Sequence, residues 1–597
     1  MNGIGPRFVR AWLSSVHITV WAALLALVLA APSLGLGYVL DDKIHQVILR
    51  SDLDFIEPVE PVWDLFAFMD GTEARNRKLM DRGLFPWWTD PHLRAQFLRP
   101  LSALTHVFDH AVAPKNAVFA HAHSLLWLAI CVLLAGALYR RSLQATPAAG
   151  LAVLMFAVDD AHGIPAAWLA NRNALIAMAF GLGAIIWHIE AYQRKRTWLA
   201  VGAPGLLLCS LLAAEAGIAT VAYLAAFALF FPQPWWRISA SDRLRRLLTL
   251  APYAVAVVGW KWAHSAGGYG AANSGLYIDP IREPGLFWEA VVVRVPVLLS
   301  AQWTPVPSDL VMVMGEGGRV EWAVVAALLV ATLSTWIWRR SQRHQAVGMW
   351  LTGATLAALP IAAAFPSNRL LMFVGLGVFG ALGDLIESWM LPTASHRLGS
   401  GLKLVAGASV ASHLVVAPVA SMMAAPAVHL LGETLPSRCA DAVEPDAPLD
   451  DVTLVFINAH ALCAAYVGPS RALDGATMPV HVRVLASIFS DIEIKRVDAK
   501  TLLIDVAAGY HQHPMDRLMR RGDRPLPVGS TVELTGFTAV IEAHNAGGRV
   551  RRVRFIFDEP LDSPRLRFFE LVGGGTRPFA VPTVGASVRI AAQLPLI

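Results

Sequence analysis

Charged residues are scarce in this chain. Asp, Glu, Lys and Arg make up 16% of its 597 residues, whereas soluble domains carry about 25%. Hydrophobic residues make up 55% of the sequence. This composition excludes an ordinary soluble globular protein and indicates a polytopic α-helical membrane protein with a soluble appendage.

Positive charge is not concentrated in one region. The net charge is +5, but the basic residues form short clusters between apolar runs, such as Arg194-Lys195-Arg196. This pattern excludes a nucleic-acid-binding surface and is typical of residues that orient membrane helices. The N-terminal apolar run is too long for the core of a signal peptide and lacks an obvious cleavage site, so we expect a retained first helix.

Cysteine is rare as well, with four residues in the chain. Cys131 and Cys209 lie inside apolar runs. Cys439 and Cys463 flank the start of the C-terminal region and could pair only if that region faces an oxidising compartment.

Long apolar runs are abundant, and they predict about eleven membrane spans. With the N-terminus in the cytoplasm, every inner loop is basic, as the positive-inside rule requires. This topology needs residues 264–319 to stay outside, with 286–301 as an interfacial or re-entrant segment. The runs cover 16–40, 117–138, 147–158, 164–190, 198–213, 216–232, 247–263, 320–338, 345–365, 369–390 and 404–430.

The chain divides into a membrane domain, 1–435, and an extracytoplasmic β-rich domain, 436–597. The membrane domain has two long outer loops, 41–116 and 264–319. In the second domain, short β-branched runs separated by Gly, Pro and Asp predict an antiparallel sandwich or barrel. The expected strands are 452–458, 480–488, 492–497, 501–506, 531–541, 549–557 and 587–592.

Two adjacent carboxylates, Asp41 and Asp42, follow the first span. At the mouth of a membrane helix a carboxyl group is still hydrated but borders a low-dielectric wall, which favours base chemistry at the membrane surface. The alternative interpretation is a hydrated turn that only ends the helix.

Further polar residues are expected on the same outer face, which is how a site at the membrane surface would be built. Arg99 could hold a lipid phosphate, or it could snorkel or pair with a neighbouring acid. Arg172 lies inside a span and needs an anion, for which Asp159, Asp160 or a phosphate would serve. The segment Asn368-Arg369 offers a second cation. A transporter would more often place such groups near the bilayer centre.

The motif His511-Gln512-His513 in the β-rich domain has two metal-ligand residue types. No third ligand is implied by the spacing, so we interpret this segment as a surface loop.

Several short motifs together resemble one family of membrane enzymes. The chain is similar to the GT-C glycosyltransferases, which use polyprenyl-phosphate sugars, and especially to the branch of protein O-mannosyltransferases and transmembrane O-mannosyltransferases with tetratricopeptide tails. The likeness covers roughly residues 16–390. The matching pieces are Tyr38-x-x-Asp41-Asp42, Arg99-Pro100-Leu101, His121-x-His123-Ser124-Leu125-Leu126, His162 to Trp168 with Asn171-Arg172-Asn173-Ala174-Leu175, and Glu215-x-Gly217-Ile218.

The resemblance implies a role for each group. Asp41 or Asp42 would be the base that activates the acceptor, since attack on an anomeric carbon needs a proton acceptor near the nucleophile. Arg99, Arg172 or Arg369 would hold the donor phosphate, because the departing phosphate needs cationic stabilisation. Metal use varies among these enzymes, so a divalent cation at the carboxylates is left open. The supporting residues would be Asp159, Asp160, His162 and Glu215.

The chain also departs from the family pattern. Asp159-Asp160 stand where the family usually has His-Pro, Ile164 replaces an expected acid, and Ala214 replaces an expected Lys. No tetratricopeptide repeat follows the membrane part. These changes fit a different acceptor, with Asp160 standing in for the lost acid, or a fold retained without catalysis.

Three functions therefore stay open. The first is a glycosyltransferase that moves a sugar from a polyprenyl-phosphate donor to an outer-face acceptor or envelope protein. The second is an inactive GT-C-fold scaffold that anchors the β-rich domain at the membrane. The third is a transporter of lipid-linked substrates. All three have membrane lipids as partners and none involves nucleic acid.

Overall fold

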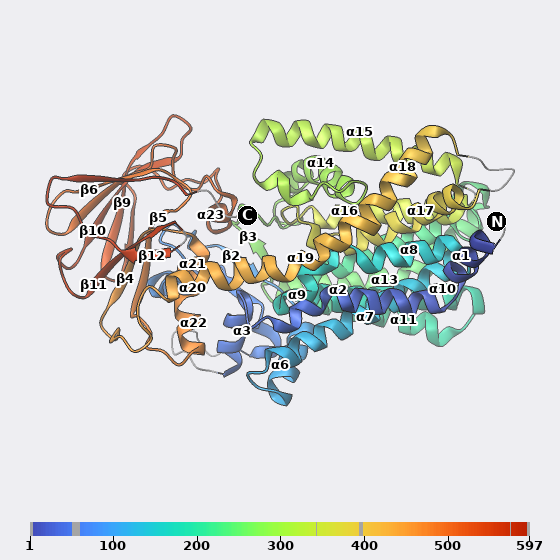
Figure 1. Cartoon of the computed structure of the whole chain (residues 1–597), viewed down its shortest axis with the longest axis horizontal. Coiled ribbons are helices and arrows are strands. Elements are labelled where there is room, and N and C mark those ends of the chain that lie inside the picture. Colours follow the sequence, from blue (N-terminus) through green and yellow to red (C-terminus); the bar gives the residue numbers. More distant parts are fainter. Residues whose placement is uncertain (1–3, 51–59, 342, 393–397, 574, 594–597) are drawn as a thin grey trace. The chain divides into compact units, whose positions relative to one another are not determined.

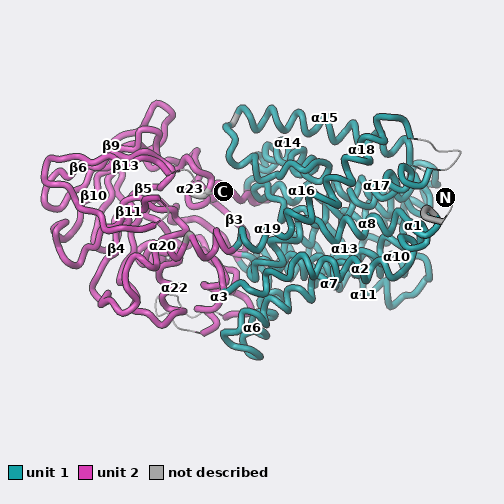
Figure 2. The backbone as a smooth tube through the Cα atoms, viewed as in Figure 1, with its two compact units in different colours: residues 1–37, 97–267, 283–428 teal, residues 38–96, 268–282, 429–597 magenta. Residues whose placement is uncertain are grey.

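The computed structural model describes residues 4–50, 60–341, 343–392, 398–573 and 575–593. They form two compact units (Figure 2). Unit 1 comprises 1–37, 97–267 and 283–428, and unit 2 comprises 38–96, 268–282 and 429–597. The first loop therefore belongs with the C-terminal region from residue 38 to 96, whereas the sequence assigns it to the membrane domain.

Unit 1 is a bundle of apolar helices, and the chain is a multi-pass membrane protein (Figure 1). Within the described residues, eight helices are long and apolar enough to cross a membrane, or up to nine with a bent pair counted as one span, compared with about eleven expected. The helices are α1 (Ile4–Ser14), α2 (His17–Ala30), α6 (Pro100–Val112), α7 (Ala117–Ser142), α8 (Pro147–Val158), α9 (Gly163–Ala167), α10 (Arg172–Arg194), α11 (Thr197–Ala213), α12 (Ala219–Phe230), α13 (Ala240–Ala266), α14 (Pro284–Ala301), α15 (Glu316–Arg340), α16 (His344–Ile361), α17 (Met372–Met390), α18 (Ser400–Ala411) and α19 (Ala417–His429).

Two regions of the bundle differ from the expected spans. Helix α14 is long and apolar enough to cross a membrane, although the sequence predicts an interfacial or re-entrant segment there. Pro147–Val158 and Asp160–Ala167 form the bent pair, with an angle of 44° between them. The break falls at Asp159, whose backbone is extended (ψ 136°), so the acidic pair lies at the bend.

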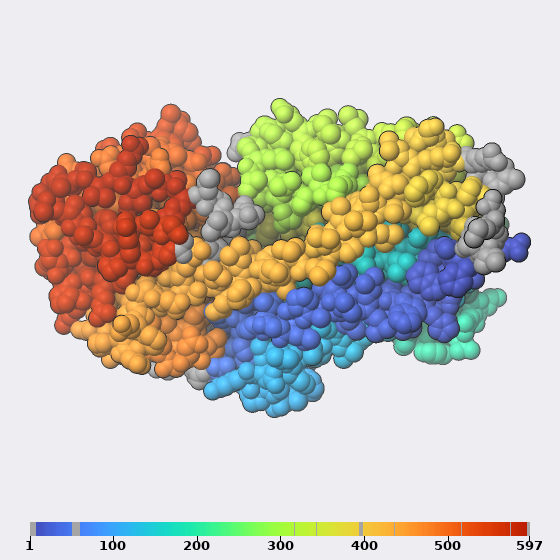
Figure 3. All heavy atoms as spheres, in the orientation of Figure 1, coloured from blue at the N-terminus to red at the C-terminus, as the bar shows by residue number. Residues whose placement is uncertain are grey.

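The C-terminal helices of unit 1 present an apolar outer surface. Helix α18 packs against α17, and residues 400–429 appear in yellow and orange in Figure 3. Leu404, Val419 and Met423 on these helices are 74%, 60% and 57% exposed. Outward-facing aliphatic side chains at this density are expected where a helix faces lipid rather than water.

Unit 2 contains two larger sheets and a small one. A six-stranded antiparallel sheet has the order β13-β6-β7-β10-β9-β8, and a four-stranded sheet has the order β12-β11-β4-β5. Strands β1 (Ala67–Asp70), β2 (Arg94–Gln96) and β3 (Gly270–Ala272) form the small sheet. The other strands are β4 (Thr453–Ala459), β5 (His481–Ser487), β6 (Ile492–Arg496), β7 (Thr501–Asp505), β8 (Thr531–Leu534), β9 (Phe537–His544), β10 (Val550–Phe557), β11 (Leu566–Val572), β12 (Gly575–Pro578) and β13 (Ser587–Ile590).

The four-stranded sheet is not purely antiparallel, unlike the expected sandwich or barrel. Strands β11, β4 and β5 run parallel to one another. A parallel pair needs a crossover connection, and the short helices α21 (Ala461–Ala465) and α22 (Val467–Leu473) lie between β4 and β5. Strands β11 and β12 were not expected, and the predicted strand 531–541 is two strands, β8 and β9.

The first loop packs into the core of unit 2. Trp87 and Trp88 are 2% and 1% exposed and belong to the same hydrophobic core as β4, β5 and β10. Helix α5 (Glu73–Arg82) ends at Gly83, which has φ +90°. A Cβ on Gly83 would lie 2.2 Å from the Val482 carbonyl oxygen, so only glycine permits this approach. The loop is thus part of the folded unit.

Candidate functional site

The bend after α8 places Asp160 beside a second short segment of unit 1. Asn368 Nδ2 donates a hydrogen bond to Asp160 Oδ2 at 2.7 Å. The amide oxygen of Asn368 accepts from the Ser308 backbone N–H and hydroxyl at 2.9 and 3.0 Å. Three segments far apart in the sequence are therefore joined through one amide side chain.

Arg369 is held next to this junction. Its Nη1 donates to Asn171 Oδ1 at 3.3 Å, and its guanidinium lies 5.5 Å from the ring centres of both Trp168 and Phe365. Within the described part of the chain, no carboxylate oxygen lies within 4.0 Å of its guanidinium nitrogens. Arg369 is therefore a cation stacked on aromatic rings, half-buried and without a bound counter-ion among these residues.

Asp159 and His162 lie on the buried side of the bend. Asp159 is 2% exposed, and its Oδ2 accepts from Gln302 Nε2 at a long 3.5 Å. The His162 Nδ1 faces the Asp159 carbonyl oxygen at 3.3 Å, and its ring packs edge-on against Phe156. Through these contacts, both side chains stabilise the bend from the buried side of the bundle.

Arg172 is paired with an acid that the sequence analysis does not name. Its fully buried side chain forms an ion pair with Asp109 Oδ2 at 2.6 Å. It also donates to Ser124 Oγ at 2.8 Å and to the Ala120 carbonyl at 2.7 Å. These bonds tie α6, α7 and α10 together, so in this structure Arg172 is a buried clamp.

The same carboxylate holds a histidine. Asp109 Oδ1 lies 2.7 Å from His123 Nδ1, and Trp127 Nε1 donates to His123 Nε2 at 3.1 Å. Of these residues the sequence singles out His123 in a motif, but not Asp109. Asp109 precedes His123 by fourteen residues and lies on another helix. No short sequence motif could therefore have predicted this pair.

Arg99 pairs with Glu215, which was one of its expected alternatives. Its Nε and Nη2 both lie 2.9 Å from Glu215 Oε2, and its guanidinium lies 4.4 Å from the Phe97 ring centre. Two motifs from the resemblance are therefore in direct contact. The Arg99 and Glu215 side chains are 20% and 28% exposed, and Glu215 Oε1 has no partner among the described groups.

Asp41 and Asp42 belong to unit 2, at the start of α3 (Asp41–Arg50). The Tyr466 hydroxyl donates to Asp41 Oδ1 at 2.7 Å. The pKa of Tyr466 is raised well above its usual value by burial and by the neighbouring Asp41 charge, so this hydroxyl stays protonated. Asp42 is 2% exposed, and its Oδ2 accepts from the Val39 N–H at 3.2 Å. Asp41 is half-buried and is the more accessible of the two.

A cation completes this part of unit 2. Lys43 Nζ lies 2.8 Å from Glu433 Oε2 and donates to Ser470 Oγ at 3.1 Å. The sequence gives no signal for either contact or for Tyr466, because all three partners are some 400 residues away. Only the inclusion of the first loop in unit 2 brings them together.

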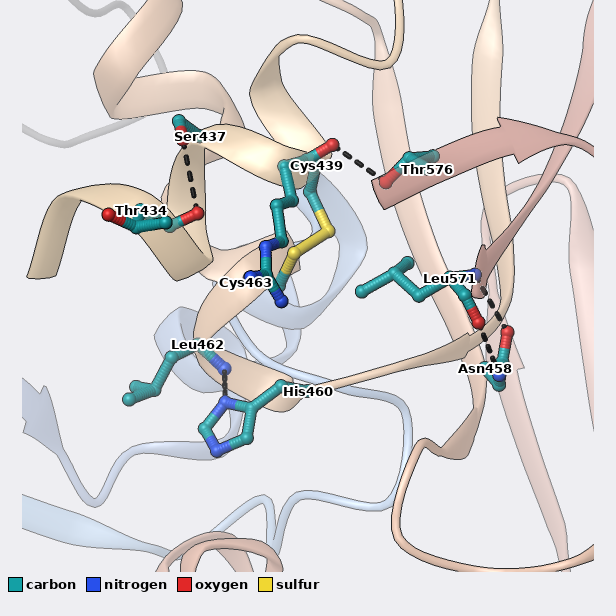
Figure 4. The surroundings of a disulfide bond; sticks show 10 residues. Thr434, Ser437, Cys439, Asn458, His460, Leu462, Cys463, Leu571 and Thr576 are labelled. Atoms are coloured by element: carbon teal, nitrogen blue, oxygen red, sulfur yellow. Dashed lines mark hydrogen bonds between the residues drawn. A yellow bond between two sulfur atoms is a disulfide. The ribbon is translucent and has the colours of Figure 1, made fainter. Parts of the chain in front are cut away.

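Cys439 and Cys463, which could pair only in an oxidising compartment, form a disulfide in the structure. Cys439 in α20 (Leu435–Ala440) is bonded to Cys463 in α21, while Cys131 and Cys209 are free (Figure 4). For metals, the described residues contain no group of three or more His, Cys, Asp or Glu side chains that could hold an ion.

No protein-family model and no curated protein matches the chain. Among solved structures, it is similar to the oligosaccharyltransferase AglB from Archaeoglobus fulgidus in complex with an inhibitory peptide and a dolichol-phosphate, with 12% identity and a TM-score of 0.43. That match covers 79% of this chain and 64% of AglB, so the chain spans less than two thirds of that protein.

Two other structures have comparable likeness. ArnT from Cupriavidus metallidurans bound to undecaprenyl phosphate has 15% identity and a TM-score of 0.31, over 74% of this chain and 88% of ArnT. The arabinofuranosyltransferase AftD from Mycobacteria has 14% identity and a TM-score of 0.36, over 92% of this chain and 40% of AftD.

Proposed function

We propose that the protein is a GT-C-type membrane glycosyltransferase that moves a sugar from a polyprenyl-phosphate donor to an acceptor on the outer face. The observation that carries the proposal is the environment of Arg369. This cation lies over Trp168 and Phe365, is oriented by Asn171, and has no carboxylate among the described residues to neutralise it. Such a cation suits a ligand that brings its own negative charge.

The ring under Arg369 offers a second donor. The indole Nε1 of Trp168 is buried and has no hydrogen-bond partner among the described residues. A buried donor without a partner costs stability unless a ligand or water satisfies it. A phosphate oxygen would satisfy it while its charge pairs with Arg369, and a polyprenyl chain is compatible with the apolar bundle.

In the proposed reaction, an acceptor oxygen attacks the anomeric carbon and the bond from that carbon to the phosphate oxygen breaks. The polyprenyl phosphate leaves with the electron pair, and Arg369 stabilises its charge. Of the two carboxylates that start α3, Asp41 is the better candidate for a proton acceptor, because Asp42 accepts the Val39 N–H and is almost fully buried. Arg99 is a second donor-phosphate candidate if its pairing with Glu215 opens.

The remaining predicted residues take supporting roles. Asp160 positions Arg369 through Asn368, and Asp159 with His162 braces the bend. We propose that Arg172 positions Asn171, its neighbour in the sequence, rather than contacting phosphate, because its bonds to Asp109, Ser124 and Ala120 are already made.

The disulfide supports an outward-facing unit 2. Such bonds persist in oxidising compartments and are rare in the cytosol, so Cys439–Cys463 favours an extracytoplasmic C-terminal region. The proposed cytoplasmic N-terminus is based on the basic inner loops instead.

The test is transfer of radiolabelled sugar from a panel of polyprenyl-phosphate sugars by the purified protein in nanodiscs. Product should form with at least one donor and fall at least about tenfold in Arg369→Gln and in Asp41→Asn. Partner binding that survives in Asp41→Asn without product from any donor would favour the scaffold, and solute flux across proteoliposomes would favour the transporter.

A further inference from the structure

Aromatic side chains gather at the carboxyl ends of two neighbouring parallel strands in unit 2. His460 directly follows β4, Phe489 lies two residues after β5, and His513 directly precedes α23 (Pro514–Met519). The Phe489 and His513 ring centres are 3.9 Å apart with an interplanar angle of 27°, and the His460 ring is 5.3 Å from Phe489. All three side chains are half-buried. In open α/β sheets, this end of parallel strands is where ligands bind.

The imidazoles in this cluster are uncharged at neutral pH. Burial lowers the pKa of His460 to about 4, and burial also lowers the pKa of His513. His460 Nδ1 accepts the Leu462 backbone N–H at 3.1 Å (Figure 4), so in the neutral ring the proton is on Nε2. The cluster therefore offers aromatic faces and a neutral N–H donor rather than positive charge.

A buried carboxyl group follows the cluster in the chain, and the backbone N–H of its residue, Asp516, donates to the His513 carbonyl oxygen at 3.1 Å. Asp516 lies on α23, three residues after His513, and is 1% exposed. Burial raises its pKa to about 7, while the neighbouring Ser487 hydroxyl at the end of β5 lowers it. By geometry, however, neither Asp516 Oδ1 nor the Ser487 hydroxyl has a hydrogen-bond partner among the described groups. Buried polar atoms in native proteins almost always have a partner, so an unpaired one marks a place where a ligand or water belongs.

We propose that the carboxyl ends of β4 and β5, with His460, Phe489, His513 and Asp516, form a binding site for a neutral saccharide. The C–H faces of a sugar ring pack on aromatic side chains, and its hydroxyls exchange hydrogen bonds with the imidazole N–H and with the unpaired carboxyl oxygen. The uncharged rings do not favour an anion. This inference concerns unit 2 alone and does not rest on the proposed transfer reaction.

The experiment is saturation-transfer NMR on the full-length protein in nanodiscs, with maltotriose, mannotriose and cellotriose as probes. At least one probe should show saturable transfer to its ring C–H protons. The signal should fall at least about fivefold in Phe489→Ala and in His513→Ala, since each removes an aromatic face. His92→Ala is the matched control, because His92 is an exposed histidine of the same unit, and its signal should stay unchanged.

Absence of transfer to all three probes would overturn the proposal, and so would equal signals in wild type and the two alanine variants. If those variants unfold, His460→Gln replaces them: it keeps a hydrogen-bonding group but removes the ring, and an unchanged signal overturns the proposal. Transfer to hexaproline but to no saccharide identifies a peptide site instead. Arg369→Gln should bind saccharide normally, which separates this result from failure of the transferase proposal.

Discussion

Asn368 donates a 2.7 Å hydrogen bond to Asp160, which lies 208 positions earlier in the chain. The same amide accepts two hydrogen bonds from Ser308, and the next residue is Arg369. The position of the candidate phosphate-binding cation is therefore determined by a polar junction at the bend of α8 and α9.

Breaking this junction should impair activity because Arg369 moves, although its charge is unchanged. Asn368→Ala leaves Asp160 and Ser308 without a shared partner, so we expect at least about a tenfold loss of transfer with Arg369 still present. Asp160→Asn is the matched variant, because its amide oxygen can still accept from Asn368. If Asp160→Asn loses as much transfer as Asn368→Ala, the Asp160 charge contributes beyond positioning.

Removal of the buried Arg172–Asp109 pair should destabilise the fold. Arg172→Met leaves the Asp109 carboxylate without its 2.6 Å partner, and breaking a buried pair costs about 3–5 kcal/mol. We expect a clear fall in Tm, which tryptophan fluorescence during heating would measure. Arg194→Ala removes a 59% exposed arginine from Glu190, which keeps its pair with Arg141, and should shift Tm little. Equal Tm values for the two variants would contradict the clamp role.

The disulfide should stabilise unit 2 and report its compartment. Cys439 and Cys463 are 24 residues apart, for which loop closure predicts about 3.5 kcal/mol of stabilisation. Cys439→Ser with Cys463→Ser should therefore lower Tm. In whole cells, neither cysteine should react with a membrane-impermeant maleimide until a reductant is added. Labelling without reductant would contradict the bonded state.

Asp516 should make stability depend on pH in a defined direction. Its folded pKa of about 7 lies above the usual aspartate value of 3.8, so the folded state binds more protons than the unfolded state between these values. Its contribution to stability is therefore present at acidic pH and is lost as pH rises from about 4 to about 7.

Asp516→Asn removes this contribution. Relative to wild type, the variant should gain stability as pH rises across that window, by at most about 4 kcal/mol. The measurement is Tm against pH for both proteins, which cancels the opposite trend from His460 and His511, whose pKa values are lowered by burial to about 4 and about 3. A Tm difference that stays constant from pH 4 to pH 7 would show that Asp516 does not titrate there.

The overall class could be predicted from the sequence, because hydropathy and charge report directly on the bilayer. The bundle and the C-terminal strands are both present, and seven expected strand regions coincide with strands. Parallel pairing of β4 with β5 was missed because helices α21 and α22, of five and seven residues, are too short to show helical periodicity.

Site partners were harder to predict than site residues. Arg99, Arg172 and Arg369 stand out because cations at membrane helices are rare. Their partners Glu215, Asp109 and Asn171 lie on other elements, and pairing across 63 to 198 positions leaves no local pattern. Tyr466 next to Asp41 follows only from the packing of the first loop with the C-terminal strands.

Binding of a polyprenyl phosphate without sugar tests the central claim most directly. We would measure the Kd of undecaprenyl phosphate and of dolichyl phosphate for wild type, Arg369→Gln and Arg245→Gln, where Arg245 is an exposed arginine of the same unit with an 80% exposed side chain. The account predicts saturable binding to wild type and Arg245→Gln, and at least about tenfold weaker binding to Arg369→Gln, as expected for loss of a charge-assisted contact. Equal Kd values for wild type and Arg369→Gln would contradict it.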